Sequence, residues 1–227
     1  QLFATLGLTA DASSSTGENA ALFKYLPSVQ AGIRFANTSL LREVRGIDEL
    51  TLRGEYSQLT NSRYSSHYSK YYYSSKMFRE ITGLVRGNLP NTKLKPEVVH
   101  TTTIGLDFAT LARRLSFSAE IFEERTQDML TKQQIAPVYG FGHVYDNAGE
   151  IKTRGIDFSL QASLIQNKNF EWAIGGNITH YKSEIVKLGK TGQEIIQFSD
   201  GTMLLNKVGE TPYQFYGYQA EKVIASE

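Results

Sequence analysis

The sequence lacks cysteine, long apolar runs and net charge. Without cysteine among its 227 residues, it has neither a disulfide scaffold nor a thiolate metal site, and it suits passage through an oxidising periplasm. No apolar run reaches the roughly 18 residues that a transmembrane helix needs. The 24 basic and 23 acidic residues leave a net charge of +1, which gives no reason to expect nucleic acid as a partner.

These absences do not exclude a membrane protein. A strand that crosses a membrane needs only about 10 residues, half of them apolar, so a whole barrel can be polar on average. The mean hydropathy of −0.31 therefore suits a soluble domain and a barrel equally. Thirteen Tyr, 12 Phe and 19 Gly favour β structure, because aromatic side chains fit pleated surfaces and membrane-interface girdles.

The clearest pattern lies in residues 147–165, NAGEIKTRGIDFSLQASLI. After Gly155, apolar and polar side chains alternate, which predicts a strand with one apolar and one polar face. The same alternation predicts seven strands, at residues 1–11, 26–36, 50–58, 100–109, 115–126, 147–165 and 170–185. Short and long connections alternate between these strands, as they do in membrane β-barrels.

The long connections read as irregular loops at residues 60–97, at 127–147 and from Val186 onward. The only helical expectation is a single turn over 40–47. Long loops of this kind count against a compact soluble domain and are usually functional.

Several segments resemble the SusC/RagA family of TonB-linked outer-membrane transporters in order and spacing. They are LPSVQAGIRF, LTLRGEYSQLTN, NTKLKPEVVHTTTIGLDFATLARRLSFSAEIFEERTQDML, NAGEIKTRGIDFSLQASLI, FEWAIGGNITHYKSEIVKL and VGETPYQFYGYQAEKV. The sequence departs from the family pattern at a few positions. Ile33 stands for Trp, Ser57 for Gly and Phe122 for Tyr, and Lys182–Ser183 stands near a usual Lys–Asn. These exchanges leave the expected fold intact.

The resemblance implies an all-β fold, in which antiparallel strands form part of a transmembrane barrel of about 22 strands. It also implies long extracellular loops and short periplasmic turns. The chain opens on Gln1 inside a strand pattern and shows no signal peptide, so we expect residues 1–227 to be an internal piece of a longer protein. The plug domain and the first and last strands would lie outside it.

The alternation assigns strand residues to two environments. The polar residues predicted to line the lumen are Arg53, Glu55, Asp107, Glu120, Asp157 and Gln161. The apolar residues predicted to face lipid are Ile104, Leu106, Phe117, Ile121, Ile156, Phe158 and Leu160.

The sharpest local feature is the aromatic segment YSSHYSKYYYSSKMF, residues 64–78. Tyrosine rings could stack on sugar faces or pack against a partner, or they could form an aromatic girdle with loop self-packing. A second aromatic segment surrounds Tyr139, Phe141 and Tyr145. The candidates for ligand or partner contact are Tyr68, Tyr71, Tyr72, Tyr73, Tyr139 and Phe141.

No catalytic or cofactor motif accompanies these features, so we expect neither an enzyme nor a bound cofactor or metal. The acidic group at Glu120, Glu123 and Glu124 is better explained by wall polarity or ion pairs than by acid–base catalysis. The four histidines have no metal-ligand spacing. The arginines of the strands are expected to pair with neighbouring carboxylates; they are Arg34, Arg53, Arg125 and Arg154.

The resulting hypothesis is a segment of a TonB-dependent importer in the outer membrane of a Gram-negative bacterium. The resemblance implies oligosaccharide or peptide cargo, a SusD-like surface lipoprotein as a lid, outer-membrane lipid around the barrel, and the TonB complex acting through the plug. Two alternatives stay open: a soluble β-sandwich that binds carbohydrate, and a barrel that serves as a scaffold or secretion partner.

Overall fold

The computed structural model describes residues 1–35, 46–190, 192 and 194–218. Seven strands form one antiparallel sheet in the order β1-β2-β3-β6-β7-β8-β9. Their bounds are β1 Leu2–Ala12, β2 Phe23–Arg34, β3 Ile47–Asn61, β6 Glu97–Thr110, β7 Leu115–Gln134, β8 His143–Gln166 and β9 Glu171–Lys187. Every hydrogen-bonded neighbour in this sheet is also the next of these strands along the chain, so the predicted all-β antiparallel fold is confirmed.

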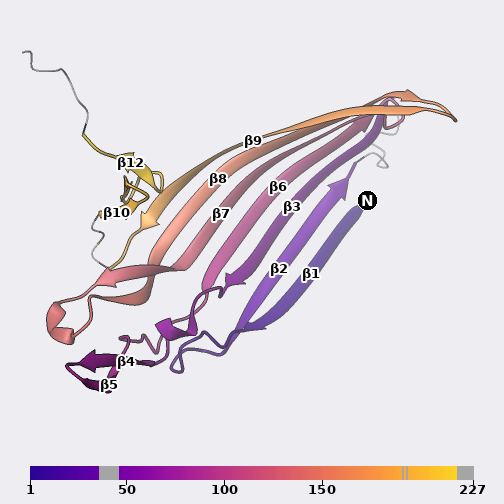
Figure 1. Ribbon diagram of the computed structural model, residues 1–227. Coiled ribbons are helices and arrows are strands. Elements are labelled where there is room, and N and C mark those ends of the chain that lie inside the picture. The colour runs from indigo at the N-terminus through magenta and orange to yellow at the C-terminus, as the bar shows by residue number, and fades with distance from the viewer. Residues whose placement is uncertain (36–45, 191, 193, 219–227) are drawn as a thin grey trace, which may run out of the picture.

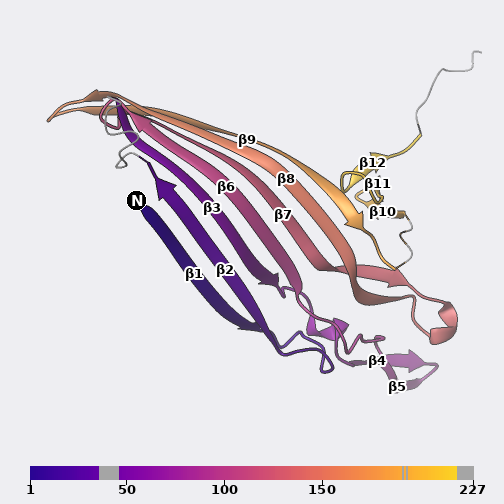
Figure 2. The ribbon, with the colours of Figure 1, turned by 180° about the vertical axis from the view of Figure 1, so that it is seen from behind.

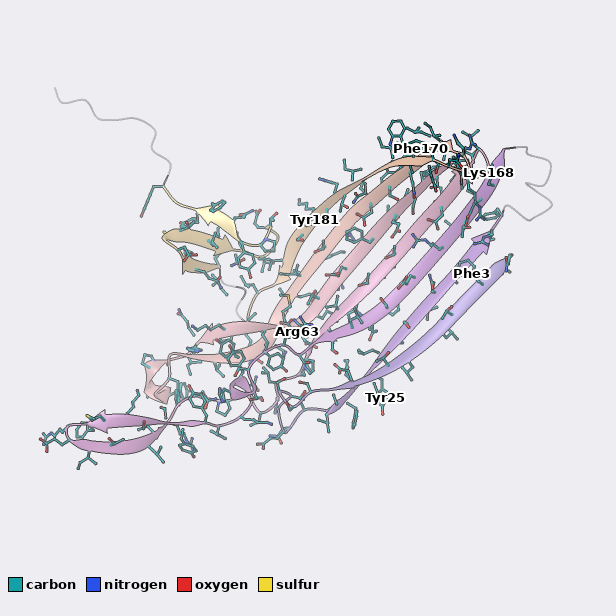
Figure 3. All side chains as sticks on the ribbon, turned by 45° about the vertical axis from the view of Figure 1, so that its right-hand side comes forward. Phe3, Tyr25, Arg63, Lys168, Phe170 and Tyr181 are labelled. Carbon is teal, nitrogen blue, oxygen red and sulfur yellow. The ribbon has the colours of Figure 1, made fainter. Side chains whose placement is uncertain are left out.

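The sheet is a single bowed layer (Figures 1 and 2). Its strands are much longer than those of an average soluble domain; β8 alone has 24 residues. At one end of the sheet, short connections join neighbouring strands, for example residues 111–114 and 167–170. Lys168 and Phe170 mark this turn end in Figure 3, and Arg63 lies towards the opposite, loop end.

The loop end contains more regular structure than the sequence predicts. Residues 60–97, expected as an irregular loop, contain a 3₁₀ turn, η1 (Ser66–Tyr68), and a hairpin of β4 (Tyr73–Phe78) and β5 (Ile81–Arg86). Beyond β9, β10 (Ile195–Ser199), β11 (Thr202–Asn206) and β12 (Gln214–Tyr216) form a separate three-stranded sheet. Both were predicted as loop because their strands are short and lack clean alternation.

The second predicted loop, 127–147, is also shorter in the structure. Strands β7 and β8 continue past a register shift between Thr126 and Met129, so only residues 135–142 connect them, with a second 3₁₀ turn, η2, at Pro137–Tyr139. A bulge of this kind breaks the period-two alternation on which the strand prediction relied. Of the predicted helical turn over 40–47, residues 40–45 lie outside the described part, and Ile47 begins β3.

The few fully buried apolar side chains lie mainly at the loop end. They include Leu94, Val98, Ala148 and Ile185, each no more than 4 % exposed. Leu94 belongs to the connection before β6. The backbone of this connection is hydrogen-bonded to the β1–β2 connection, where the Gly17 amide donates to the Leu94 carbonyl at 2.7 Å. The loops therefore pack on one another, while the long sheet leaves both faces open.

Candidate functional site

The register of the sheet sorts the predicted wall residues onto two faces. Residues paired across neighbouring strands point to the same side of a sheet. Ile104 pairs with Ile121, which pairs with Ile156, so these three share one face. Leu106, Phe117, Phe158 and Leu160 fall on the same face. The six polar candidates all fall on the opposite face.

Side-chain contacts agree with this apolar face. The ring of Phe117 lies 5.2 Å from that of Phe108 and 6.0 Å from that of Phe158, between centroids. Large apolar side chains nevertheless remain open: Ile104, Ile121 and Ile156 are 51 to 55 % exposed. A contiguous exposed apolar surface of this extent marks contact with another apolar phase or partner.

This apolar face has slanted borders. One hydrogen-bonded row joins Ile33 of β2 to Ile178 of β9 through the strands between them. On β2 the apolar side chains extend from this row to Tyr25, eight positions towards the loops. On β9 the apolar side chains of this face end at Ile178. The next side chains on the same face, towards the loop end, are His180 and Lys182.

The slant has the size that a tilted barrel requires. At a tilt of about 45°, neighbouring strands 4.8 Å apart are offset along the membrane normal by roughly 1.4 residues. Five strand-to-strand steps then give an offset of roughly seven positions, against the eight observed. Tyr25 and Tyr56 lie at the loop-side border and Trp172 at the opposite border, as interfacial aromatic side chains do.

The opposite face carries an ion-pair network centred on Arg53. The Arg53 Nε donates to Asp107 Oδ2 at 3.0 Å, and the same guanidinium pairs with Glu120 on the next strand but one. Ser118 donates to the second Asp107 oxygen at 2.7 Å. Arg53 reaches Glu120 across Gly105, where a Cβ atom would lie 2.9 Å from the guanidinium carbon.

The other three strand arginines are paired as well, which confirms that expectation. Arg34 pairs with Glu49, Arg125 with Glu150 and Arg154 with Glu123. Glu55, Asp157 and Gln161 lie on the polar face, outside the Arg53 network. Because Asp157 pairs in register with Glu120, this part of the face has a surplus of negative charge.

The two aromatic loops meet at the loop end and enclose a pocket of about 320 Å³. Tyr68 stacks on Tyr145 with ring centroids 3.8 Å apart and an interplanar angle of 16°. Hydrogen bonding to Tyr145, with some burial, raises the pKa of the Tyr68 hydroxyl, so it remains a neutral phenol at physiological pH. The ring walls of the pocket are His67, Tyr68, Tyr72, Phe141, His143 and Tyr145.

Asparagines fix the backbone around this pocket. The Asn88 side chain donates to the Lys70 carbonyl at 2.8 Å and accepts from the Tyr72 amide at 3.2 Å. Asn91 donates to the Tyr145 carbonyl at 3.1 Å and so joins the two loops. Sequence patterns do not reveal these roles, because a loop asparagine that binds distant backbone resembles any other turn residue.

Only some of the predicted loop candidates line the pocket: Tyr68, Tyr72 and Phe141. Tyr71 lies instead beside Arg86, whose guanidinium carbon is 5.0 Å from the ring centroid. Tyr73 and Tyr139 are 61 and 66 % exposed and lie outside the pocket. The sequence gives His67 and His143 no metal-ligand spacing and no other signal, so their place in the pocket wall was not predicted.

Two further observations on the described part of the chain concern metal ions and membrane-crossing helices. There, no group of three or more His, Cys, Asp or Glu residues is placed to hold a metal ion. Within the same residues, no helix is long and apolar enough to cross a membrane.

Comparison with known proteins gives a family match and several relatives for this chain. The family model described as TonB dependent receptor-like, beta-barrel matches residues 1–215. TonB-dependent receptor P39 of Formosa agariphila is 27 % identical over 216 residues, covering 95 % of this chain and 20 % of the relative. TonB-dependent receptor SusC of Bacteroides thetaiotaomicron is 26 % identical over 220 residues, covering 85 % of this chain and 21 % of the relative.

Solved structures agree on the fold. The structure described as the RagAB peptide transporter superposes with a TM-score of 0.82 at 24 % identity, covering 94 % of this chain and 23 % of the solved chain. The chain thus spans about a fifth of the length of the curated relatives it matches. On the match over residues 1–215, the chain belongs to the TonB-dependent receptor-like β-barrel family.

Proposed function

We propose that this chain forms part of the wall and extracellular loops of a TonB-dependent outer-membrane importer of large nutrients, either oligosaccharides or peptides. The slanted apolar face is the observation that carries the proposal. It is exposed and contiguous, bordered by aromatic side chains, and offset from strand to strand as a tilted barrel in a bilayer requires. The function is transport, without bond chemistry.

In this proposal the two faces have different surroundings. Phe158 and the six other apolar candidates contact outer-membrane lipid. Arg53 and the five other polar candidates line the lumen, where partly solvated ion pairs are tolerated. The loop end, with its packed connections and its pocket, is extracellular, and the short connections are periplasmic.

The loops also offer a surface for a protein partner. The β4–β5 hairpin extends away from the main sheet (Figure 1), and its apolar residues Met77, Phe78, Ile81 and Leu84 are each at least 75 % exposed. We propose that a SusD-like surface lipoprotein covers this hairpin. The TonB complex would act through a plug domain, which we propose lies outside residues 1–227.

A soluble β-sandwich requires a second sheet packed on the apolar face. Among the described residues, the other sheets are the β4–β5 hairpin and β10–β12, and both lie at the loop end (Figures 1 and 2). This arrangement favours the barrel. A barrel that serves as a scaffold or secretion partner is separated from an importer by an uptake measurement.

The decisive experiment combines fractionation of the native protein with uptake. We expect these residues within a polypeptide of about 100 kDa or more that is extracted from outer membranes by detergent, and we expect deletion of its gene to abolish growth on an oligosaccharide or peptide source. A free 25.4 kDa soluble species would contradict the proposal. An outer-membrane protein whose deletion changes no uptake would favour the scaffold.

A further inference from the structure

The pocket between the two aromatic loops has an uncharged lining. Its lining residues, all of them described, include no Asp, Glu, Lys or Arg. Partial burial, with the nearby Lys132 charge, lowers the pKa of His143, so its imidazole is neutral at pH 7. Of the charged groups nearby, Lys190 is paired with Asp146 at 2.6 Å, and Lys132 acts on His143 from outside the lining.

The pocket combines flat apolar surfaces with polar edges. The His67 and Tyr72 rings lie 4.8 Å apart, and the His143 ring meets Tyr145 edge-on at 5.5 Å. Tyrosine and histidine rings present apolar faces together with a hydroxyl or imidazole nitrogen that can donate or accept hydrogen bonds. Six of the eleven lining residues carry rings, so the cavity offers ring faces together with a comparable polar surface, a mixture that suits a small polar ligand.

The walls are held in place before any ligand arrives. Asn88 and Asn91 fix the backbone on both sides, as described above. Gly87 lets the Tyr72 ring lie flat against the chain, because a Cβ atom at Gly87 would come within 2.0 Å of a ring carbon. The Gly87 amide also bonds the Tyr72 carbonyl at 2.9 Å. A preorganised wall of this kind binds without a large ordering cost.

We infer that this pocket binds one neutral sugar ring of an oligosaccharide. This inference rests on the proposed function and narrows its cargo. A sugar ring offers C–H faces to the aromatic walls and hydroxyls to the phenol and imidazole edges. A uronic acid or a peptide terminus would bring a charge for which the lining has no partner. A phenylalanine side chain would leave the polar edges without hydrogen bonds.

The test uses the full-length receptor, purified from outer membranes in detergent. Its binding to neutral glucan, xylan and mannan hexasaccharides, to a hexagalacturonate and to a Phe-containing hexapeptide is measured by calorimetry. We expect binding of at least one neutral hexasaccharide, weakened at least tenfold by Phe141→Ala. The matched control is Tyr139→Ala, which removes an aromatic ring from the same loop outside the pocket and should leave the affinity unchanged.

A second pair of variants separates a loss of binding from misfolding. Gly87→Ala, which displaces the Tyr72 ring, should weaken binding, whereas Gly83→Ala in the adjoining β5 should not, since a Cβ atom there has nothing within 4 Å. Equal effects within either pair overturn the inference. So does wild-type binding of the hexagalacturonate or the peptide alone, or of nothing. If uptake of some cargo still requires the outer-membrane protein, the proposed function stands while the sugar pocket fails.

Discussion

The Arg53 network shows how a single glycine determines which carboxylate an arginine pairs with. Sequence alone predicts that Arg53 pairs with a wall carboxylate, but not with which one. Glu120 is accessible only because Gly105, on the strand between them, has no side chain. The residue type therefore predicts the pairing, and the register selects the partner.

We expect Arg53→Met to destabilise the folded barrel by about 1 kcal/mol, because it leaves Asp107 and Glu120 facing one another without a cation. The figure is small because these side chains are still 24 to 33 % exposed. The temperature at which the folded gel band of the full receptor disappears measures the effect. Arg53→Lys should restore part of it, and exposed Arg63→Met should have none; equal losses for the two methionine variants would contradict the network.

Asn147, near the loop end of β8, hydrogen-bonds two other segments of the chain through its side chain. Its Nδ2 donates to the carbonyls of Lys95 at 2.8 Å and of Asp128 at 2.7 Å, and its Oδ1 accepts from the Lys95 amide at 3.0 Å. Asn147→Ala leaves these backbone groups without partners, at a local cost of about 1–3 kcal/mol. Hydrogen exchange should speed up in residues 91–97 and 127–131. Asn169→Ala, at the turn end, should leave those segments unchanged; protection that survives in the Asn147 variant would show that the contacts are not stabilising.

At the element scale, the strands were predictable and the loops were not. Alternation over eight or more residues determines a strand and its facing. All seven main strands were predicted, six of them within a few residues of both ends, while the predicted end of β7 falls eight residues short. The β7–β8 bulge, the β4–β5 hairpin and the β10–β12 sheet escaped because each is short or interrupts the period of two. The short connection at residues 110–114 was predicted, but its backbone conformation was not: Leu111, Ala112 and Arg113 have φ of 54–61° without any glycine.

The candidate site was also only partly predictable from the sequence. The aromatic loops were identified by composition, yet composition could not separate Phe141, which lines the pocket, from Tyr139, which does not. That distinction depends on how two loops far apart in sequence pack together through Asn91. Long-range side-chain-to-backbone bonds leave no periodic signal.

The β4–β5 hairpin carries its own prediction. If a lipoprotein covers its tip, replacing Met77 and Phe78 together by Ser should reduce the amount of lipoprotein that co-purifies with the receptor several-fold, because desolvated apolar anchors dominate protein interfaces. Val138→Ser, a change at an 86 % exposed apolar residue of the neighbouring loop, is the matched control. Undiminished co-purification of the double variant would place the partner elsewhere.

At the scale of the whole molecule, the facing of the sheet is tested by neighbouring residues. Phe158→Arg should impair barrel assembly by about 2–4 kcal/mol if its side chain meets lipid near the membrane centre. Ser159→Arg, one position on and on the opposite face, should assemble almost normally in a polar lumen. The measurement is the heat-modifiable folded fraction in outer membranes. A Phe158→Arg variant that assembles as well as wild type would show the facing to be wrong.

The tilt gives a sharper test, because it predicts different outcomes within one row of the sheet. Val29 and Thr102 belong to the same hydrogen-bonded row and face, through Tyr56, and this row ends at Arg154 and Lys182. On β2 the apolar side chains continue past Val29 to Tyr25, whereas on β6 they end at Ile104, so Val29 lies inside the apolar face and Thr102 at its border. Val29→Arg should therefore reduce the folded fraction strongly, while Thr102→Arg should be tolerated, as Arg154 already is. Equal losses at both positions would mean that the membrane border follows the rows, and that the sheet does not stand in the bilayer as a tilted barrel wall.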